Sequence, residues 1–125
     1  ELEEAVADEV EARRPHGLLV FDPLDGVTGP PDHRAASEAA LAVAGRRALP
    51  VLGWALPRPV SEALRAEHGA GFAGYPPEDL VEVAVDRGRQ LRAVACDASQ
   101  AVPGSVLWRR LELLGDREFV RRLLP

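Results

Sequence analysis

The sequence contains no lysine, methionine, isoleucine or asparagine, and it has a single cysteine, Cys96. One cysteine cannot form an internal disulfide, so a reducing cytoplasm is the expected location. No apolar run approaches the roughly 20 residues of a membrane-spanning helix, and no signal peptide is evident. The 15 basic residues, all arginine, face 20 acidic ones, which gives a net charge of −5. Nucleic acids and anionic membranes are therefore not expected partners, because either needs a basic surface.

What is present has the composition of an ordinary globular domain. Hydrophobic residues make up 46% and charged residues 28% of the 125 residues. A chain of this length buries roughly two-thirds of its unfolded surface, which predicts one core and a single domain over residues 1–125. The chain opens at Glu1, inside a helical pattern and without an initiator methionine. This favours the later part of a longer protein, or a processed product.

Strands that alternate with helices are predicted along the chain. Leu2, Val6 and Val10 recur at helical spacing, which predicts a helix over residues 2–14. The continuous apolar run over residues 17–21 is typical of a strand that is buried on both faces. Further strands are predicted at 50–56 and 80–85, and further helices at about 33–47, 62–68, 87–98, 105–114 and 117–124. This alternation predicts an α/β fold with a mostly parallel sheet, in which three strands are few enough to indicate missing upstream strands.

The loop from Asp22 to His33 is the first candidate for a ligand site. Ligands of open α/β sheets bind beyond the carboxyl ends of the strands, which is where this loop begins. His33 is expected in the first turn of the next helix, with its imidazole at the edge of the sheet. Asp32 has the simpler interpretation of a helix N-cap. Spacing alone does not make a metal site of His33, because catalytic zinc needs about three protein ligands and no second donor motif lies nearby.

Three other patterns have structural interpretations that are stronger than the functional ones. Asp22 and Asp25 suggest phosphatases of the haloacid dehalogenase type, but those need D-x-D and a later cationic residue, so turn capping is favoured. Residues 69–74 match G-x-G-x-x-G. A dinucleotide site needs a strand before this motif and a helix after it, and here a helix precedes it, so a loop is expected. Cys96 has no histidine beside it, which favours a buried structural thiol over a nucleophile.

The loop residues Gly29-Pro30-Pro31-Asp32-His33 resemble a motif of a known enzyme family. Residues 21–36 are similar to the second motif of the LmbE-like, or PIG-L, zinc N-deacetylases, in which a Gly-His-Pro-Asp-His loop is followed by a helix. The resemblance continues in order through residues 75–80, the strand that ends at residues 85–86, and residues 95–100, where relatives read His-x-Ser-Gln. The mycothiol-pathway deacetylases and amidases are the branch that the chain most resembles.

The resemblance implies a fold, a cofactor and an activity. The fold would be a Rossmann-like three-layer α/β/α domain, of which this chain is an incomplete, C-terminal part. The cofactor would be one zinc ion, and the reaction would be hydrolysis of the acetamide of an N-acetylglucosamine-type conjugate by zinc-activated water. The last histidine of the motif, a zinc ligand in the family, falls on His33. Asp32 would orient neighbouring groups. Asp97 occupies the position of the histidine in His-x-Ser-Gln.

The chain departs from the family pattern in three places. The N-terminal His-Pro-Asp-Asp block, which supplies two zinc ligands and the general base in the family, is absent, so the missing N-terminal half of the domain is an expected partner. Pro30 replaces the histidine that helps to stabilise the oxyanion, and Asp97 replaces the histidine of His-x-Ser-Gln. Losing one oxyanion donor typically costs about 10²–10³ in rate. The alternative function is therefore a catalytically degenerate relative that binds a sugar conjugate or a protein.

Overall fold

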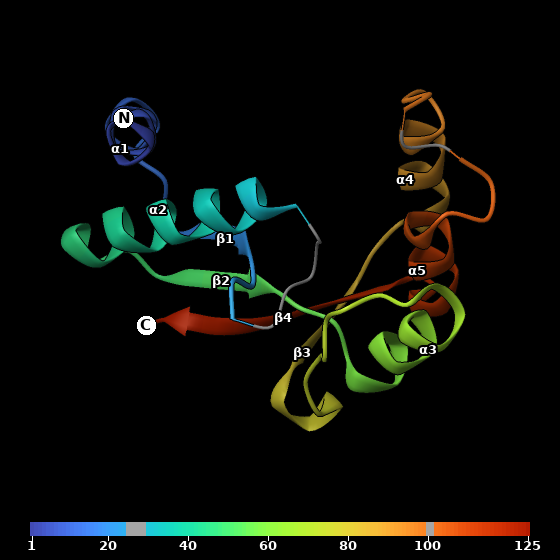
Figure 1. Cartoon of the computed structure of the whole chain (residues 1–125). Coiled ribbons are helices and arrows are strands. Elements are labelled where there is room, and N and C mark those ends of the chain that lie inside the picture. The colour runs from blue at the N-terminus through green and yellow to red at the C-terminus, as the bar shows by residue number, and fades with distance from the viewer. Residues whose placement is uncertain (25–29, 100–101) are drawn as a thin grey trace.

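The computed structural model describes residues 1–24, 30–99 and 102–125. Within these ranges the chain forms an α/β fold with one mixed four-stranded sheet (Figure 1). The α-helices are α1 (Leu2–Arg13), α2 (Pro31–Arg47), α3 (Arg58–His68), α4 (Arg87–Val94) and α5 (Val106–Leu114), and a short 3₁₀ helix covers Pro77–Asp79. The strands are β1 (Leu18–Phe21), β2 (Val51–Trp54), β3 (Val81–Ala84) and β4 (Arg117–Leu124).

The strands lie in the order β1-β2-β4-β3, with β2 and β4 in the centre of the sheet. β1 runs parallel to β2, with Leu19 opposite Leu52. β4 runs antiparallel to both of its neighbours, with Val120 opposite Trp54 of β2 and Val81 of β3. The prediction of a mostly parallel sheet is therefore wrong, because two of the three described pairings are antiparallel.

Strand β4 accounts for this difference. Residues 117–124 were predicted to form a helix, and they form a strand of eight residues instead. Phe119 and Val120 are adjacent in sequence and both buried, as expected for a strand with neighbours on both sides and side chains on both faces. A short segment of this kind has no periodicity that separates helix from strand. Its hydrogen bonds to the distant strands β2 and β3 decide its conformation.

The first turns of α2 and α3 differ slightly from the predictions. Helix α2 begins at Pro31, two residues before its predicted start, and α3 begins at Arg58, four residues before its predicted start. Each helix has a proline in its first turn. Proline is favourable there, because its fixed φ suits a helix and its missing N–H has no partner within the first turn. The prolines that indicate a loop in the sequence therefore lie in the first turns of these two helices.

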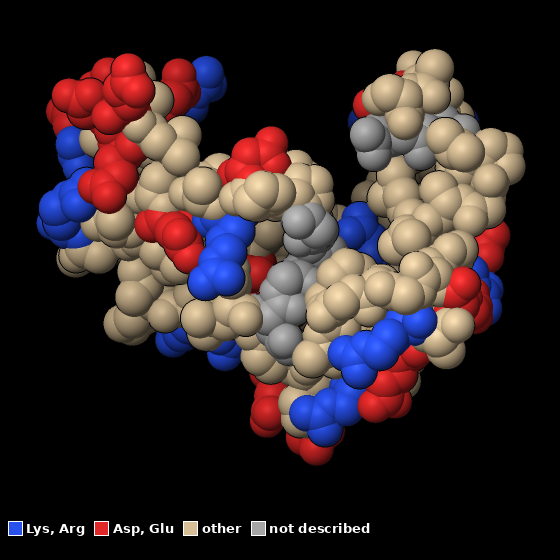
Figure 2. Space-filling model, in the orientation of Figure 1, with Lys and Arg blue, Asp and Glu red and all other residues tan. Residues whose placement is uncertain are grey.

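The described residues divide into two groups of helices (Figure 1). α1 packs on α2, which lies against β1, whereas α3 packs against α5 at the other end of the sheet. Figure 2 shows a notch in the surface between the arm formed by α1 and α2 and the arm formed by α4 and α5. No helix among the described residues is long and apolar enough to cross a membrane.

Candidate functional site

His33 lies at the carboxyl edge of the sheet. It is in the first turn of α2, two residues after the helix begins at Pro31, and its ring stacks on Phe21, the last residue of β1. The two ring centroids are 5.2 Å apart and the ring planes differ by 15°. The predicted position of His33 at the start of a helix and at the sheet edge is confirmed. Its role as a metal ligand stays a prediction.

Asp32 lies in α2 and Asp97 lies after the end of α4, and both are exposed. Asp32 lies inside α2 and not at its N-cap, which is Pro30, so the predicted capping position is wrong by two residues. Asp97 follows the end of α4, and its Oδ1 accepts hydrogen bonds from the backbone N–H (3.0 Å) and the hydroxyl (2.6 Å) of Ser99. Asp97 therefore stabilises its own turn, and its catalytic role stays a prediction.

The described residues do not by themselves fit the zinc ion that the resemblance implies. A catalytic zinc site needs about three protein ligands, usually histidine, cysteine or carboxylate side chains. In the part of the chain that the structure describes, no group of three or more such side chains could hold a metal ion. Among residues 1–24, 30–99 and 102–125, His33 is thus one possible zinc ligand, and the other ligands that a site needs are not beside it.

Asp22 is the centre of a polar cluster directly after β1. Its side chain is fully buried, and its Oδ1 accepts hydrogen bonds from the backbone N–H of Leu24 and the hydroxyl of Tyr75, both at 2.9 Å. Its Oδ2 accepts a hydrogen bond from Nε of Arg121 at 2.5 Å. The Arg121 guanidinium also lies over the Tyr75 ring, 4.4 Å from its centroid. The predicted turn-capping role of Asp22 is confirmed, whereas Asp25 lies outside the described residues.

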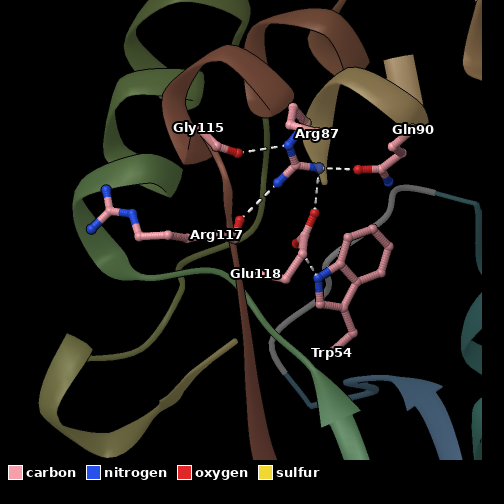
Figure 3. Close-up of polar contacts among 6 residues, drawn as sticks. All are labelled: Trp54, Arg87, Gln90, Gly115, Arg117 and Glu118. Atoms are coloured by element: carbon pink, nitrogen blue, oxygen red, sulfur yellow. Dashed lines mark hydrogen bonds and ion pairs between the residues drawn. The ribbon is translucent and has the colours of Figure 1, made fainter. Parts of the chain in front are cut away.

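A second cluster surrounds the buried guanidinium of Arg87, the first residue of α4 (Figure 3). Its Nε donates to the carbonyl of Gly115 (2.6 Å) and its Nη2 to the carbonyl of Arg117 (2.7 Å). Its Nη1 donates to a carboxylate oxygen of Glu118 (2.6 Å) and to the side-chain oxygen of Gln90. Each nitrogen of this guanidinium therefore has a partner, as burial of a charge requires.

Trp54 connects the Arg87 cluster to His33. Its indole N–H donates to Glu118 at 2.6 Å, and its ring stacks on Phe21 with a centroid distance of 5.3 Å. The Arg110 guanidinium lies 4.7 Å from the centroid of the Trp54 ring. Burial lowers the pKa of Arg110, and the nearby Glu118 carboxylate opposes this effect. His33, Phe21 and Trp54 thus form a row of three stacked rings that runs from α2 across β1 to β2.

Two hollows meet at Trp54 and Leu19. The first, which we call the His33 hollow, has a volume of about 420 Å³ and is lined by Leu19, Val20, Phe21, His33, Ala36, Ser37, Ala40 and Trp54. The second, which we call the sheet groove, has a volume of about 620 Å³ and is lined by Leu19, Leu52, Trp54, Val83, Val85, Asp86, Gln90, Glu118 and Val120. Both have the size of ligand sites, which are mostly apolar with a few polar groups.

The structure also decides the interpretation of two other motifs. Cys96 was predicted to be buried and is exposed, because helix α4 ends at Val94 and leaves the thiol in the following turn. The glycine-rich segment 69–74 is a loop after α3, as predicted. Gly69 is the C-cap of that helix at φ 68°, so its role is to end a helix and not to bind a dinucleotide.

Sequence reasoning missed Tyr75, Arg121, Arg87 and Glu118 as partners in polar clusters. The one available signal was Asp22 itself, since an aspartate that follows a buried strand needs a hydrogen-bonding partner. No protein-family model, no curated protein and no solved structure matches this chain. The resemblance therefore rests on the motif residues, of which residues 25–29 and Gln100 lie outside the described residues.

Proposed function

We propose that this chain is the sugar-binding part of a PIG-L/LmbE-type N-deacetylase domain. The observation that carries the proposal is the row of rings formed by His33, Phe21 and Trp54, which lies at the carboxyl edge of the sheet and lines two adjoining hollows. A pyranose ring has apolar C–H faces and polar edges. Partly exposed aromatic rings match the faces, because they offer flat apolar area that loses little conformational entropy on binding.

Polar groups lie around this row of rings. The Ser37 side chain lines the His33 hollow, and its hydroxyl donates to the carbonyl of His33 at 3.0 Å. Asp86 and Gln90 line the sheet groove beside apolar side chains; Asp86 Oδ1 accepts from the backbone N–H of Arg89 and the Gln90 side-chain oxygen accepts from Arg87, and a carboxylate or amide oxygen has a second lone pair for a ligand. An N-acetylated amino-sugar conjugate has hydroxyl and amide N–H groups that these acceptors suit, and an apolar part would lie along the groove between them.

Hydrolysis of the acetamide is the second half of the proposal. It needs further zinc ligands and a general base, which the described residues do not supply. The N-terminal His-Pro-Asp-Asp block of the family would come from another segment. That segment would also complete a Rossmann-like three-layer domain, with a location in the cytoplasm. His33 would be the contribution of this chain to the metal site. Asp32 would orient the neighbouring groups, and Asp97 would lie at the position of the second motif histidine.

The alternative, a non-enzymatic relative that binds a sugar conjugate or a protein, is favoured by two observations. Pro30, which precedes α2, can donate no hydrogen bond to a developing oxyanion. Asp97 adds a negative charge at a family histidine position, and its Oδ1 is engaged by Ser99. A relative that binds a sugar conjugate would differ from the deacetylase only in turnover, whereas one that binds a protein would differ in sugar binding as well.

Titration with methyl N-acetyl-β-glucosaminide, followed by tryptophan fluorescence and by NMR, tests sugar binding. We expect His33→Ala to weaken binding at least about tenfold, because the ring row loses its outer member. His68→Ala, at the exposed end of α3, is the matched control and should leave binding unchanged. An identical affinity of the wild type and the His33 variant would contradict the proposed site.

Turnover separates the two alternatives. In a protein that supplies the N-terminal block, we expect Pro30→His with Asp97→His to raise kcat at least about tenfold, a conservative fraction of the effect of one oxyanion donor. The measurement is the release of acetate from the same glucosaminide. Sugar binding without turnover, before and after the replacements, would assign the chain to the non-enzymatic alternative.

A further inference from the structure

Leu19 is the centre of an apolar surface that is larger than either hollow of the site. Its side chain is 69% exposed, although it lies on a strand made only of apolar residues. It lines the His33 hollow, the sheet groove and a third hollow of about 480 Å³ between α1 and β1. The third one, the α1 hollow, is lined by Ala5, Val6, Glu9, Val10, Arg13, Pro15, Leu18, Leu19, Val20 and Ala40. Continuous exposed apolar surface of this kind marks an interaction site.

The edge strand β1 has the all-apolar composition that is typical of an interior strand. The backbone N–H groups of Leu18 and Asp22 donate toward β2, to the carbonyls of Pro50 and Trp54, each at 2.9 Å. The alternate residues of β1, Leu19 among them, therefore direct their backbone groups away from β2. Natural edge strands are usually blunted by charges or proline, and β1 has neither.

The opposite edge, β3, shows the contrast. It carries Glu82, which forms an ion pair of 3.6 Å with Arg117 of β4. A charged side chain on an edge strand disfavours the addition of another strand. Glu82 therefore disfavours the addition of a further strand to β3, whereas no charged residue or proline in β1 opposes it.

Charge indicates what kind of neighbour fits. Residues 1–14 contain six acidic side chains and two arginines, a charge of −4, and α2 adds three arginines and two acidic residues, so the arm formed by these two segments carries −3. Glu3, Glu9 and Glu11 form exposed ion pairs with Arg46, Arg13 and Arg47, and the acidic excess remains beyond these pairs. The acidic side chains gather on the arm formed by α1 (Figure 2). A second copy of this chain, paired through β1 about a two-fold axis, would bring two acidic helices toward one another. A segment with arginine or lysine residues is complementary to α1 instead.

We propose that this surface binds a polypeptide segment in which an apolar β-strand adds in parallel to β1 and basic residues face α1. Parallel strands have their carboxyl ends at the same edge of a sheet. The end of the added strand therefore lies beside Asp22 and His33, where it can complete the wall of the His33 hollow. This inference rests on the proposed function. It identifies the kind of segment that would supply the zinc ligands missing beside His33.

Two synthetic peptides test this inference. Each has five alternating valine and leucine residues, flanked on both sides by two arginines in one peptide and by two glutamates in the other. We expect the arginine peptide to shift the NMR signals of Leu19 and Phe21 and to bind at least about tenfold more tightly at low ionic strength. The difference should narrow at high salt, because screening weakens the attraction to α1. Equal affinity of the two peptides would overturn the inference.

Matched variants locate the binding surface. Leu19→Asp should weaken binding of the arginine peptide at least about tenfold, whereas Val81→Asp, at a 61% exposed position of β3, should not. Both positions are exposed, so both variants should fold. Dimerisation of the free chain through Leu19 in sedimentation experiments would assign the surface to a second copy and overturn the inference. Glucosaminide binding without peptide binding would refute the docking site alone, and peptide binding without glucosaminide binding would refute the proposed function alone.

Discussion

The two ends of this molecule are stabilised by different kinds of residues. Around α3 and α5, a closed core contains large side chains, namely Leu56, Leu64, Leu114 and Phe119. Around α1 and α2, the buried positions hold smaller side chains, among them Ala40, Val43 and Ala44 of α2. The first end buries these four large side chains within itself, although Val102, before α5, is 52% exposed. The second end leaves Leu19 exposed, on the surface that we propose as a docking site.

The charged groups differ in the same way. At the α4 and α5 end, Arg87 and Glu118 form an ion pair whose side chains are 5% and 13% exposed. At the α1 and α2 end, the ion pairs of Glu3 with Arg46 and of Glu11 with Arg47 are exposed. An exposed pair contributes little, whereas removing one partner of a buried pair leaves a charge that is costly to bury. Breaking the Arg87–Glu118 pair should therefore cost more stability than breaking either exposed pair between α1 and α2.

The largest effect is expected for Arg87→Ala. This change leaves the Glu118 carboxylate with Trp54 as a donor but without its ion-pair partner, and it leaves two backbone carbonyls without their donor, so we expect the free energy of unfolding to fall by about 4 kcal/mol. The matched change Arg34→Ala removes an exposed pair with Glu38 in α2 and should cost less than about 1 kcal/mol. Urea unfolding measures both. Similar losses in the two variants would show that the Arg87 cluster is not the stabilising centre of its end.

Leu64→Ala should follow, with a loss of about 3 kcal/mol, because its side chain is fully buried in the large core and truncation leaves a cavity. Leu19→Ala should change stability by less than about 0.5 kcal/mol, since its exposed side chain loses little contact. Thermal and urea unfolding of the two variants should agree on this order. A large loss for Leu19→Ala would mean that the β1 end is closed in solution.

Two glycines sharpen the comparison at the level of the backbone. Gly74 has φ +72°, and a Cβ there would lie 2.9 Å from the carbonyl oxygen of Leu56, so Gly74→Ala should cost about 2 kcal/mol. Gly45 lies in α2 with open space around it, and Gly45→Ala should stabilise by about 0.5–1 kcal/mol. The sign of the change in denaturant midpoint is the readout. Destabilisation by both changes would contradict the open surroundings of α2.

The smallest effect concerns pH. Hydrogen bonds from Arg109 of α5 hold the pKa of Glu67, in α3, below its ordinary value of 4.5. A lowered pKa means that this pair stabilises the protein above pH 4.5, and that the contribution is lost as the pH falls through the folded-state pKa. In an NMR titration, Arg109→Gln should return the pKa toward its ordinary value. Arg65→Gln, also in α3, is the control and should leave the pKa of Glu67 where it is.

The sequence by itself determined the elements that carry strong local signals. The apolar run of β1 predicted a strand, which is confirmed, but its predicted burial on both faces is wrong, because β1 lies at the edge of the sheet and Leu19 is 69% exposed. The breaker-rich loop followed by periodic alanine and valine positions predicted α2 and placed His33 at its start. These predictions succeeded because helix starts and apolar strands depend on residues that are neighbours in the chain.

Only the tertiary structure decided the conformation of residues 117–124 and the partners of the buried charges. β4 forms its hydrogen bonds with strands that are far away in sequence, so no local pattern distinguishes it from a helix. Arg121 reaches Asp22 across 99 positions and Arg87 reaches Glu118 across 31. A buried charge shows in a sequence only that it needs a partner. Which residue meets it depends on the order and direction of the strands, and these arise when distant segments pack together.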